Sequence, residues 1–249
     1  MADSSSNDSY LAYDTLKGWD ASPFMEVSLG DRLLFDHHLG QVGLAGKKVI
    51  ELGFGNGSFL GWARERGAKV YGAEVQPKLI AKAIEQDVTI VSSDLSLSVD
   101  ALRNSVALIA AIDVMEHLSI AENRAMLVAV ASLLEPGGLL FVRFPNGASP
   151  LSLPVQAGDV THVSTLSPAI VRQLASDLPF SVRYEGAPHR SITGGVFGQI
   201  ARHIQSALRA CATKLVHAIY GRIDLYPNAL MILQRVGDEE RPLRNAMIR

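Results

Sequence analysis

The sequence predicts a doubly wound α/β fold with a mostly parallel sheet. Short apolar runs alternate with helical patterns from about residue 45 onward, which is typical of βαβ units. The first run, at 47–52, stops at three glycines spaced two apart, and several later runs end in an acidic residue. In an open α/β sheet, ligands bind at the carboxyl ends of the strands. We therefore expect one large domain with a polar ligand site along that edge.

The glycine-rich turn after the first predicted strand contains Gly53, Gly55 and Gly57. Glycine tolerates positive φ and lets a ligand come close to the backbone. A dinucleotide site requires G-x-G-x-x-G, but here the third glycine comes one residue early and Ser58 stands in the sixth position. The preceding Glu51 would repel a pyrophosphate and favours a cationic ligand, such as one with an ammonium group. A nicotinamide-dependent oxidoreductase is the alternative from another enzyme class.

The next predicted strands also end in polar side chains. Glu74 closes the second strand, Asp94 the third and Asp113 the fourth, which continues as Val-Met-Glu-His. An acid at the end of the second strand can accept both hydroxyls of a ribose. The strands expected after the first are 70–74, 88–94, 106–113 and 139–144, the last of them introduced by a turn at 135–138.

Five segments, in their order and spacing, resemble the class I S-adenosylmethionine-dependent methyltransferases. They are Glu51–Gly57, Glu74, Asp94, Asp113–His117 and Leu134–Gly138, within roughly residues 45–147. The resemblance implies a Rossmann-like sheet of seven strands with an antiparallel last strand, and S-adenosyl-L-methionine as the cofactor. It also implies that the glycine turn holds the methionine portion, Glu74 the ribose hydroxyls and Asp94 the adenine amino group. The implied cofactor-binding residues are Glu51, Gly53, Gly55, Gly57, Glu74, Val75, Asp94, Leu95, Asp113 and Met115.

Two histidines are candidate general bases. An alcohol acceptor loses its proton during methyl transfer, and a histidine near the methyl group is suited to take it. His117 follows the fourth strand, whereas His162 lies in the long loop 145–166, within Asp159-Val-Thr-His. This segment resembles one in a subgroup that includes methyltransferases acting on quinones and sugars, where the histidine faces the substrate. We expect His162 to be the base, oriented by Asp159, with His117 second; the alternative is a hydrogen-bonded knot that anchors the loop.

The rest of the chain is expected to extend and interrupt the domain. Residues 1–9 are predicted to be a disordered tail, 10–45 a helical N-terminal extension (Tyr10–Trp19, then Glu26–Leu39), and 46–249 the methyltransferase domain with an insertion at about 191–226. Ser167 as cap and Pro168 in the first turn predict a helix start. The sixth and seventh strands are expected at 181–186 and 228–235, on either side of the insertion.

The insertion is predicted to contain an amphipathic helix over about 196–222. Apolar residues recur every three or four positions, at Ile200, Ile204, Leu208, Cys211 and Leu215, and arginines and lysines are interspersed. Three interpretations stay open: packing on the parent domain, which would bury Cys211; a homodimer surface or substrate lid; or peripheral contact with an anionic membrane surface.

Composition excludes several function classes. A net charge of −2 gives no basic footprint for nucleic acid. The single Cys211 excludes an internal disulfide and a cysteine cage, and the adjacent His37 and His38 would face different ways on a helix, so no metal site is expected. The polar N-terminus lacks a secretory signal and no apolar stretch reaches about 20 residues, so a cytoplasmic location is expected.

The function expected from these residues is transfer of a methyl group from S-adenosylmethionine to a hydroxyl oxygen. The acceptor would be a small molecule or a sugar within a glycan, which places the chain in polysaccharide biosynthesis. Arg143, His189 and Arg190 could hold an anionic group of that acceptor. The alternative from a non-enzymatic class is a methyltransferase-like binding subunit that has lost catalysis.

Overall fold

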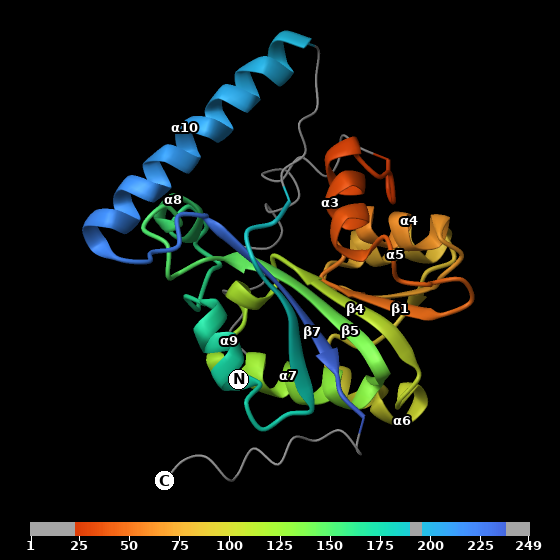
Figure 1. Ribbon diagram of the computed structural model, residues 1–249. Helices are drawn as coiled ribbons and strands as arrows, with labels where there is room; N and C mark the ends of the chain where they lie inside the picture. The colour runs from red at the N-terminus through yellow and green to blue at the C-terminus, as the bar shows by residue number, and fades with distance from the viewer. Residues whose placement is uncertain (1–22, 190–195, 238–249) are drawn as a thin grey trace, which may run out of the picture.

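The computed structural model describes residues 23–189 and 196–237, which form a three-layer α/β fold around one sheet (Figure 1). The sheet has seven strands in the order β3-β2-β1-β4-β5-β7-β6. Neighbouring strands run parallel except for β7, which is antiparallel to both β5 and β6. The strands are β1 Lys48–Leu52, β2 Lys69–Ala73, β3 Thr89–Ile90, β4 Val106–Ile112, β5 Leu134–Pro145, β6 Phe180–Gly186 and β7 Asn228–Arg235. The predicted seven-stranded doubly wound fold is therefore confirmed.

Helices cover both faces of the sheet, and each face has its own apolar core (Figure 1). One core includes residues of α3, α4 and α5, and the other includes residues of α6, α7 and α9. Central strands read as nearly continuous apolar runs because both of their faces are buried, as in the fully buried Val106–Ala111 stretch of β4. These helices are α3 Leu29–Leu39, α4 Ser58–Glu65, α5 Pro77–Glu85, α6 Val99–Leu102, α7 Ile120–Leu133 and α9 Pro168–Leu174.

Two strands differ by more than one residue from their predicted bounds. β3 keeps only two residues, because the chain beyond it turns: Ser92 Oγ accepts the Asp94 backbone N–H at 3.1 Å, and Asp94 caps the short helix η1, Leu95–Ser98. β5 begins at Leu134, so the turn predicted at 135–138 lies inside the strand, where its pairing with β4 shifts register. Gly137 has φ +84, which lets the backbone bulge there without breaking the strand.

Side-chain caps fix the starts of α3, α7 and α9. Ser119 and Glu122 form a reciprocal capping box at the start of α7. Ser167 accepts the backbone N–H of Ile170, so the predicted helix start at α9 is confirmed. Ser28 accepts the backbone N–H of Asp31 at 3.0 Å and starts α3.

The N-terminal extension contributes α3, which confirms the helix expected over Glu26–Leu39, three residues shorter at its start. Phe35 packs in an aromatic cluster with Phe59, Trp62 and Phe141, and the Trp62 indole N–H donates to Asp36 at 2.8 Å. The extension is thus part of one sheet-covering layer. The expected tail 1–9 and the expected helix Tyr10–Trp19 lie outside the described residues.

The insertion between β6 and β7 contains the predicted helix, α10, Val196–Tyr220 (Figure 1). Every residue from 204 to 212 is exposed, including Cys211. The interpretation of Cys211 as a buried thiol on a helix packed against the parent domain is therefore wrong. Periodicity predicts that a helix has an apolar face, but it does not determine whether the same chain covers that face. Among the described helices, none combines the length and apolar character needed to cross a bilayer.

Candidate functional site

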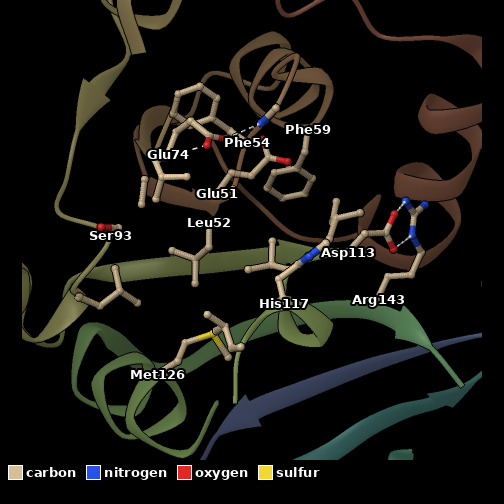
Figure 2. A pocket seen from close by; sticks show the side chains of 18 of the residues that line it. Glu51, Leu52, Phe54, Phe59, Glu74, Ser93, Asp113, His117, Met126 and Arg143 are labelled. Carbon is tan, nitrogen blue, oxygen red and sulfur yellow. Dashed lines mark hydrogen bonds and ion pairs between the residues drawn. The ribbon is translucent and has the colours of Figure 1, made fainter. Parts of the chain in front are cut away.

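A cavity of about 970 Å³ lies at the carboxyl ends of the central strands (Figure 2). Its lining comes from the ends of β1, β2 and β4, from the glycine turn, and from α3 and α7. This is the edge at which the sequence predicts a ligand site. Of the predicted residues, the cavity is lined by Glu51, Gly53, Gly55, Glu74, Val75, Asp94, Leu95, Asp113 and His117.

Four predicted residues do not line the cavity. Gly57 stands one step behind it as the N-cap of α4, with φ +75. Met115 is fully buried in the core beneath α7. His162 and Asp159 lie in the loop behind His117.

The glycine turn has a left-handed backbone at all three glycines, with φ of +57, +51 and +75 at Gly53, Gly55 and Gly57. A Cβ on Gly53 would lie 2.7 Å from Val114 Cγ2, and one on Gly57 would lie 2.9 Å from side-chain atoms of Phe24 and Met25. The first and third glycines are therefore required by the turn itself, and not only by a ligand.

Replacing Gly53 with alanine is expected to lower the free energy of unfolding by about 2 kcal/mol, because a left-handed L-residue and a contact with Val114 are forced together. Urea denaturation measures this loss. Gly46→Ala provides the control, because Gly46 has φ +71 but no atom within 4 Å of an added Cβ, so it reports the backbone strain alone. Equal losses in the two variants would contradict a role for Val114.

Glu51 places a carboxylate inside the cavity at the end of β1 and is only 4% exposed. It accepts the backbone N–H of Leu60 at 3.2 Å, from the first turn of α4. Burial raises the pKa of Glu51 well above its usual range, and the nearby Glu74 and Asp31 carboxylates raise it further, against the effect of the Leu60 hydrogen bond and of Arg143. A bound cation would compensate this buried negative charge.

Glu74 closes the glycine turn from the end of β2. Its carboxylate accepts backbone N–H groups from Gly55 at 3.2 Å, Val75 at 2.7 Å and Gln76 at 3.2 Å. Asp94, farther along the cavity, accepts the Ser96 backbone N–H at 3.0 Å and hydroxyl at 2.6 Å. Both acids are thus held in place by the backbone around them.

Asp113 directly follows β4 and has φ +55, a left-handed conformation that few non-glycine residues adopt. Arg143 on β5 donates its Nε–H to Asp113 Oδ1 at 2.9 Å, and a second guanidinium N–H donates to Oδ2 (Figure 2). The bidentate pair fixes the Asp113 side chain at the cavity wall. Arg143 therefore neutralises a protein carboxylate here instead of presenting its guanidinium to an anionic acceptor.

The other residues expected to hold an anion lie elsewhere. The His189 ring stacks on His37 at 4.0 Å, and its backbone N–H donates to His38 Nε2 at 3.1 Å, so these histidines join the end of β6 to α3. Burial, with smaller contributions from His37 and His189, lowers the pKa of His38 to about 4. Arg190 lies outside the described residues.

His117 lines the cavity on the side opposite Glu51 and Glu74 (Figure 2). Its Nδ1 lies 3.2 Å from the Thr161 carbonyl oxygen and 2.9 Å from the Thr161 hydroxyl. A carbonyl oxygen only accepts, so Nδ1 carries the proton in the neutral ring and Nε2 carries the lone pair. The Thr161 hydroxyl in turn donates to Asp159 Oδ1 at 2.5 Å. Asp159, Thr161 and His117 therefore form a hydrogen-bonded chain that leads toward the cavity.

His162 lies behind His117, with ring centroids 4.8 Å apart. Its Nδ1 donates to the Gln156 carbonyl at 3.0 Å, which leaves the lone pair on Nε2. That atom is 3.9 Å from Asp159 Oδ2 and 4.0 Å from Glu116 Oε1, beyond hydrogen-bonding distance. At that distance His162 Nε2 does not form the expected orienting hydrogen bond with Asp159, and Asp159 Oδ1 accepts the Thr161 hydroxyl instead.

Glu116, His117 and His162 also form a cluster of metal-ligand types, because one ligand atom from each lies within 4.8 Å of the others. The sequence places Glu116 and His117 together but gives no sign that the loop returns to them. Backbone bonds make the return: Val163 and Ser164 donate their N–H groups to the Glu116 carbonyl at 2.9 and 3.1 Å.

Sequence reasoning missed two acids that line the cavity, Asp31 and Glu122, the second of which belongs to the capping box of α7. Asp31 on α3 lines the cavity, and its Oδ2 accepts the hydroxyls of Ser28 and Ser58, both at 2.9 Å. The motif Ser28-x-x-Asp31 signals a helix start but says nothing about a cavity more than 20 residues downstream. Asp31 adds a further negative charge near Glu51 and Glu74, as the raised pKa of Glu51 shows.

The fold and the site together define a Rossmann-like protein with an acidic cavity at the carboxyl ends of its central strands. Known proteins agree with this class. A family model described as a methyltransferase domain matches residues 28–185. A curated ubiquinone biosynthesis O-methyltransferase of Cupriavidus pinatubonensis is 30% identical over 113 residues, and the match covers 43% of this chain and 45% of that protein. The match thus spans less than half the length of the curated relative.

Solved structures share the fold over most of the chain. A SAM-dependent methyltransferase from Archaeoglobus fulgidus is 19% identical with a TM-score of 0.58, covering 91% of this chain and 99% of that one. A geranyl diphosphate C-methyltransferase from Streptomyces coelicolor, in complex with Mg²⁺, geranyl diphosphate and S-adenosyl-L-homocysteine, is 12% identical with a TM-score of 0.53, covering 83% and 78%. The chain belongs to the class I S-adenosylmethionine-dependent methyltransferases, as its matched family domain and its fold show, and S-adenosylmethionine is its cofactor.

Proposed function

We propose that this protein transfers a methyl group to a hydroxyl oxygen of a small molecule or of a sugar within a glycan. The observation that supports it is the hydrogen-bonded chain from Asp159 through Thr161 to His117, which ends at the cavity wall. Nitrogen and sulfur acceptors need less help in losing a proton, so a positioned neutral imidazole favours an oxygen acceptor.

The cofactor would lie across the acidic side of the cavity. Glu51 would hold its ammonium group, Glu74 the ribose hydroxyls and Asp94 the adenine amino group. The bound cofactor supplies an electrophilic methyl group on a sulfonium. The protein then has to orient the acceptor in line and exclude water, which the enclosure between α3 and α7 favours.

Methyl transfer to a hydroxyl releases one proton, which a side chain of the site has to accept. The acceptor oxygen would bond to the methyl carbon as the carbon–sulfur bond of the cofactor breaks, and sulfur would keep the electron pair of that bond. His117 Nε2 takes the hydroxyl proton, and the resulting imidazolium is stabilised by Thr161 and the Asp159 carboxylate behind it. His162 would support the loop through Gln156 instead of meeting the acceptor.

The relative from Cupriavidus pinatubonensis, a ubiquinone biosynthesis O-methyltransferase, favours an oxygen acceptor too, and a quinone-like phenol is one candidate class. A sugar hydroxyl is the other, because aromatic residues make up only 6% of the chain and few line the cavity to hold a flat ring. A role in polysaccharide biosynthesis is part of this proposal.

Calorimetric titration with S-adenosylhomocysteine and, in parallel, NAD tests the cofactor site. Labelled methyl donor with phenol and sugar acceptors then tests transfer. We expect micromolar binding of S-adenosylhomocysteine alone and label in a hydroxyl-bearing acceptor. Binding without transfer to any acceptor would support a non-catalytic binding subunit, and binding of NAD alone would support an oxidoreductase.

Glu74→Ala is expected to weaken S-adenosylhomocysteine binding by about thirtyfold or more, because it removes a charged hydrogen-bond acceptor from the ribose and from three backbone N–H groups. Glu74→Gln separates these effects, since it keeps an oxygen for the turn but loses the charge. The same titration measures both variants. Wild-type affinity in both, in folded protein, would refute the ribose role of Glu74.

A further inference from the structure

Within the described part of the chain, α10 leaves an apolar stripe exposed. Ile204, Leu208, Leu215 and Ile219 repeat at helical spacing on one face, and each is more than half exposed, from 57% to 65%. The helix has 25 residues, so it is roughly 37 Å long. Soluble proteins seldom leave a continuous apolar stripe of this kind in contact with water, so the stripe is a candidate contact surface.

The charges on this helix have one sign. From residue 196 to 222 the chain contains Arg202, Arg209, Lys214 and Arg222 but no Asp or Glu, although the whole chain has a net charge of −2. Arg209 and Lys214 each adjoin a residue of the stripe, so they project about 100° from it around the helix. Both are exposed. The helix therefore presents apolar side chains flanked by cations.

We infer that α10 is a membrane-surface helix, which lays its apolar stripe into the interface of an anionic lipid bilayer. Apolar residues on one face and Lys or Arg beside them are the arrangement that anionic membranes bind, with the long basic side chains reaching the phosphates. A second copy of the chain fits less well. Pairing two such helices along their stripes would bring Arg209 and Lys214 of both copies together, and no acid in the helix would compensate them.

The loop beside the site also exposes apolar side chains. Leu151, Leu153, Val160 and Val163 in loop 145–166 are each more than half exposed. The chain that leaves α10 returns to β7 next to this loop, where the Asn146 backbone N–H donates to the Pro227 carbonyl at 2.7 Å. A membrane contact made by α10 would therefore be joined directly to the loop that carries His162. The inference does not depend on which acceptor the proposed transfer uses.

Vesicle flotation with the full chain tests this inference. The probes are vesicles of phosphatidylcholine alone and vesicles with phosphatidylglycerol added. We expect the protein to float with the second kind only, and less so as salt is raised. The variant Leu208→Glu/Leu215→Glu should lose at least about tenfold in vesicle binding, since it places charge in the stripe. Arg209→Gln/Lys214→Gln should weaken binding to the anionic vesicles by a similar factor.

The matched control is Ile84→Glu/Val128→Glu, which makes the same charge change at exposed apolar positions on α5 and α7 and should float as wild type does. S-adenosylhomocysteine binding checks that every variant is folded, and it reports separately on the proposed function. No flotation with anionic vesicles, or equal loss in the control, would overturn the inference. So would a dimer in light scattering that dissociates in Leu208→Glu/Leu215→Glu without any vesicle binding by the wild type.

Discussion

Replacing Glu51 with glutamine is expected to weaken S-adenosylhomocysteine binding by roughly thirtyfold or more and, at the same time, to stabilise the ligand-free protein on the order of 1 kcal/mol. The buried carboxylate is unfavourable without a cation, and glutamine removes its charge while an amide oxygen can still accept the Leu60 N–H. Weaker ligand binding together with higher stability of the ligand-free protein is expected of a residue whose role is to bind the ligand.

The pH dependence of stability gives the same prediction a second readout. The folded-state pKa of Glu51 is raised, so the folded ligand-free protein binds this proton more tightly than the unfolded chain does. The contribution of Glu51 to the free energy of unfolding is therefore fully present below the usual glutamate pKa of about 4.3. It is lost as the pH rises through the raised folded-state pKa. In Glu51→Gln this loss should disappear.

Urea denaturation over about pH 4 to 8, with and without S-adenosylhomocysteine, measures both effects. Glu85→Gln on the exposed side of α5 is the matched control, with the same change of charge away from the cavity. A Glu51→Gln protein that is less stable than wild type throughout would mean that the carboxylate stabilises the fold without a ligand.

Replacing His117 with asparagine is expected to lower kcat by about a hundredfold or more, with little change in S-adenosylhomocysteine affinity. The asparagine amide can still donate to Thr161 from near the Nδ1 position, but it has no atom in place of Nε2. The substitution thus removes the proposed base and keeps the loop contact. The rate of the wild-type enzyme should fall at low pH, as the imidazole becomes protonated.

His162→Asn separates the two candidate bases. It keeps a donor toward Gln156, so we expect less than about a tenfold fall in kcat. A fall as large as that of His117→Asn would assign the base to His162. Each assay is run with and without a chelator, because Glu116, His117 and His162 are also a set of ligand types for a divalent ion. Activity that vanishes with the chelator would show that these side chains act through an ion.

Much of the fold and part of the site could be predicted, because they depend on residues that are close together in the sequence. The apolar runs of β1, β2 and β4 each end in or beside an acid that lines the cavity. Glycine at position 53 permits the positive φ that the turn adopts there. Asp31 could not be predicted, because its place depends on how α3 packs against the sheet. Which of His117 and His162 lines the cavity depends on a loop that folds back over the η2 turn, Met115–His117. The exposure of Cys211 depends on which parts of the protein pack against its helix.

The position of β7 constrains how this protein acquires its structure. Among the described strands β7 is the last along the chain, but it lies between β5 and β6 and pairs with both of them. During synthesis β6 has no partner strand until residues 228–235 leave the ribosome, and α10 is made in that interval. An unpaired strand and an uncovered apolar helix would then be present together, which exposes the nascent chain to aggregation. Chains truncated before β7 should therefore be recovered as aggregates or bound to chaperones.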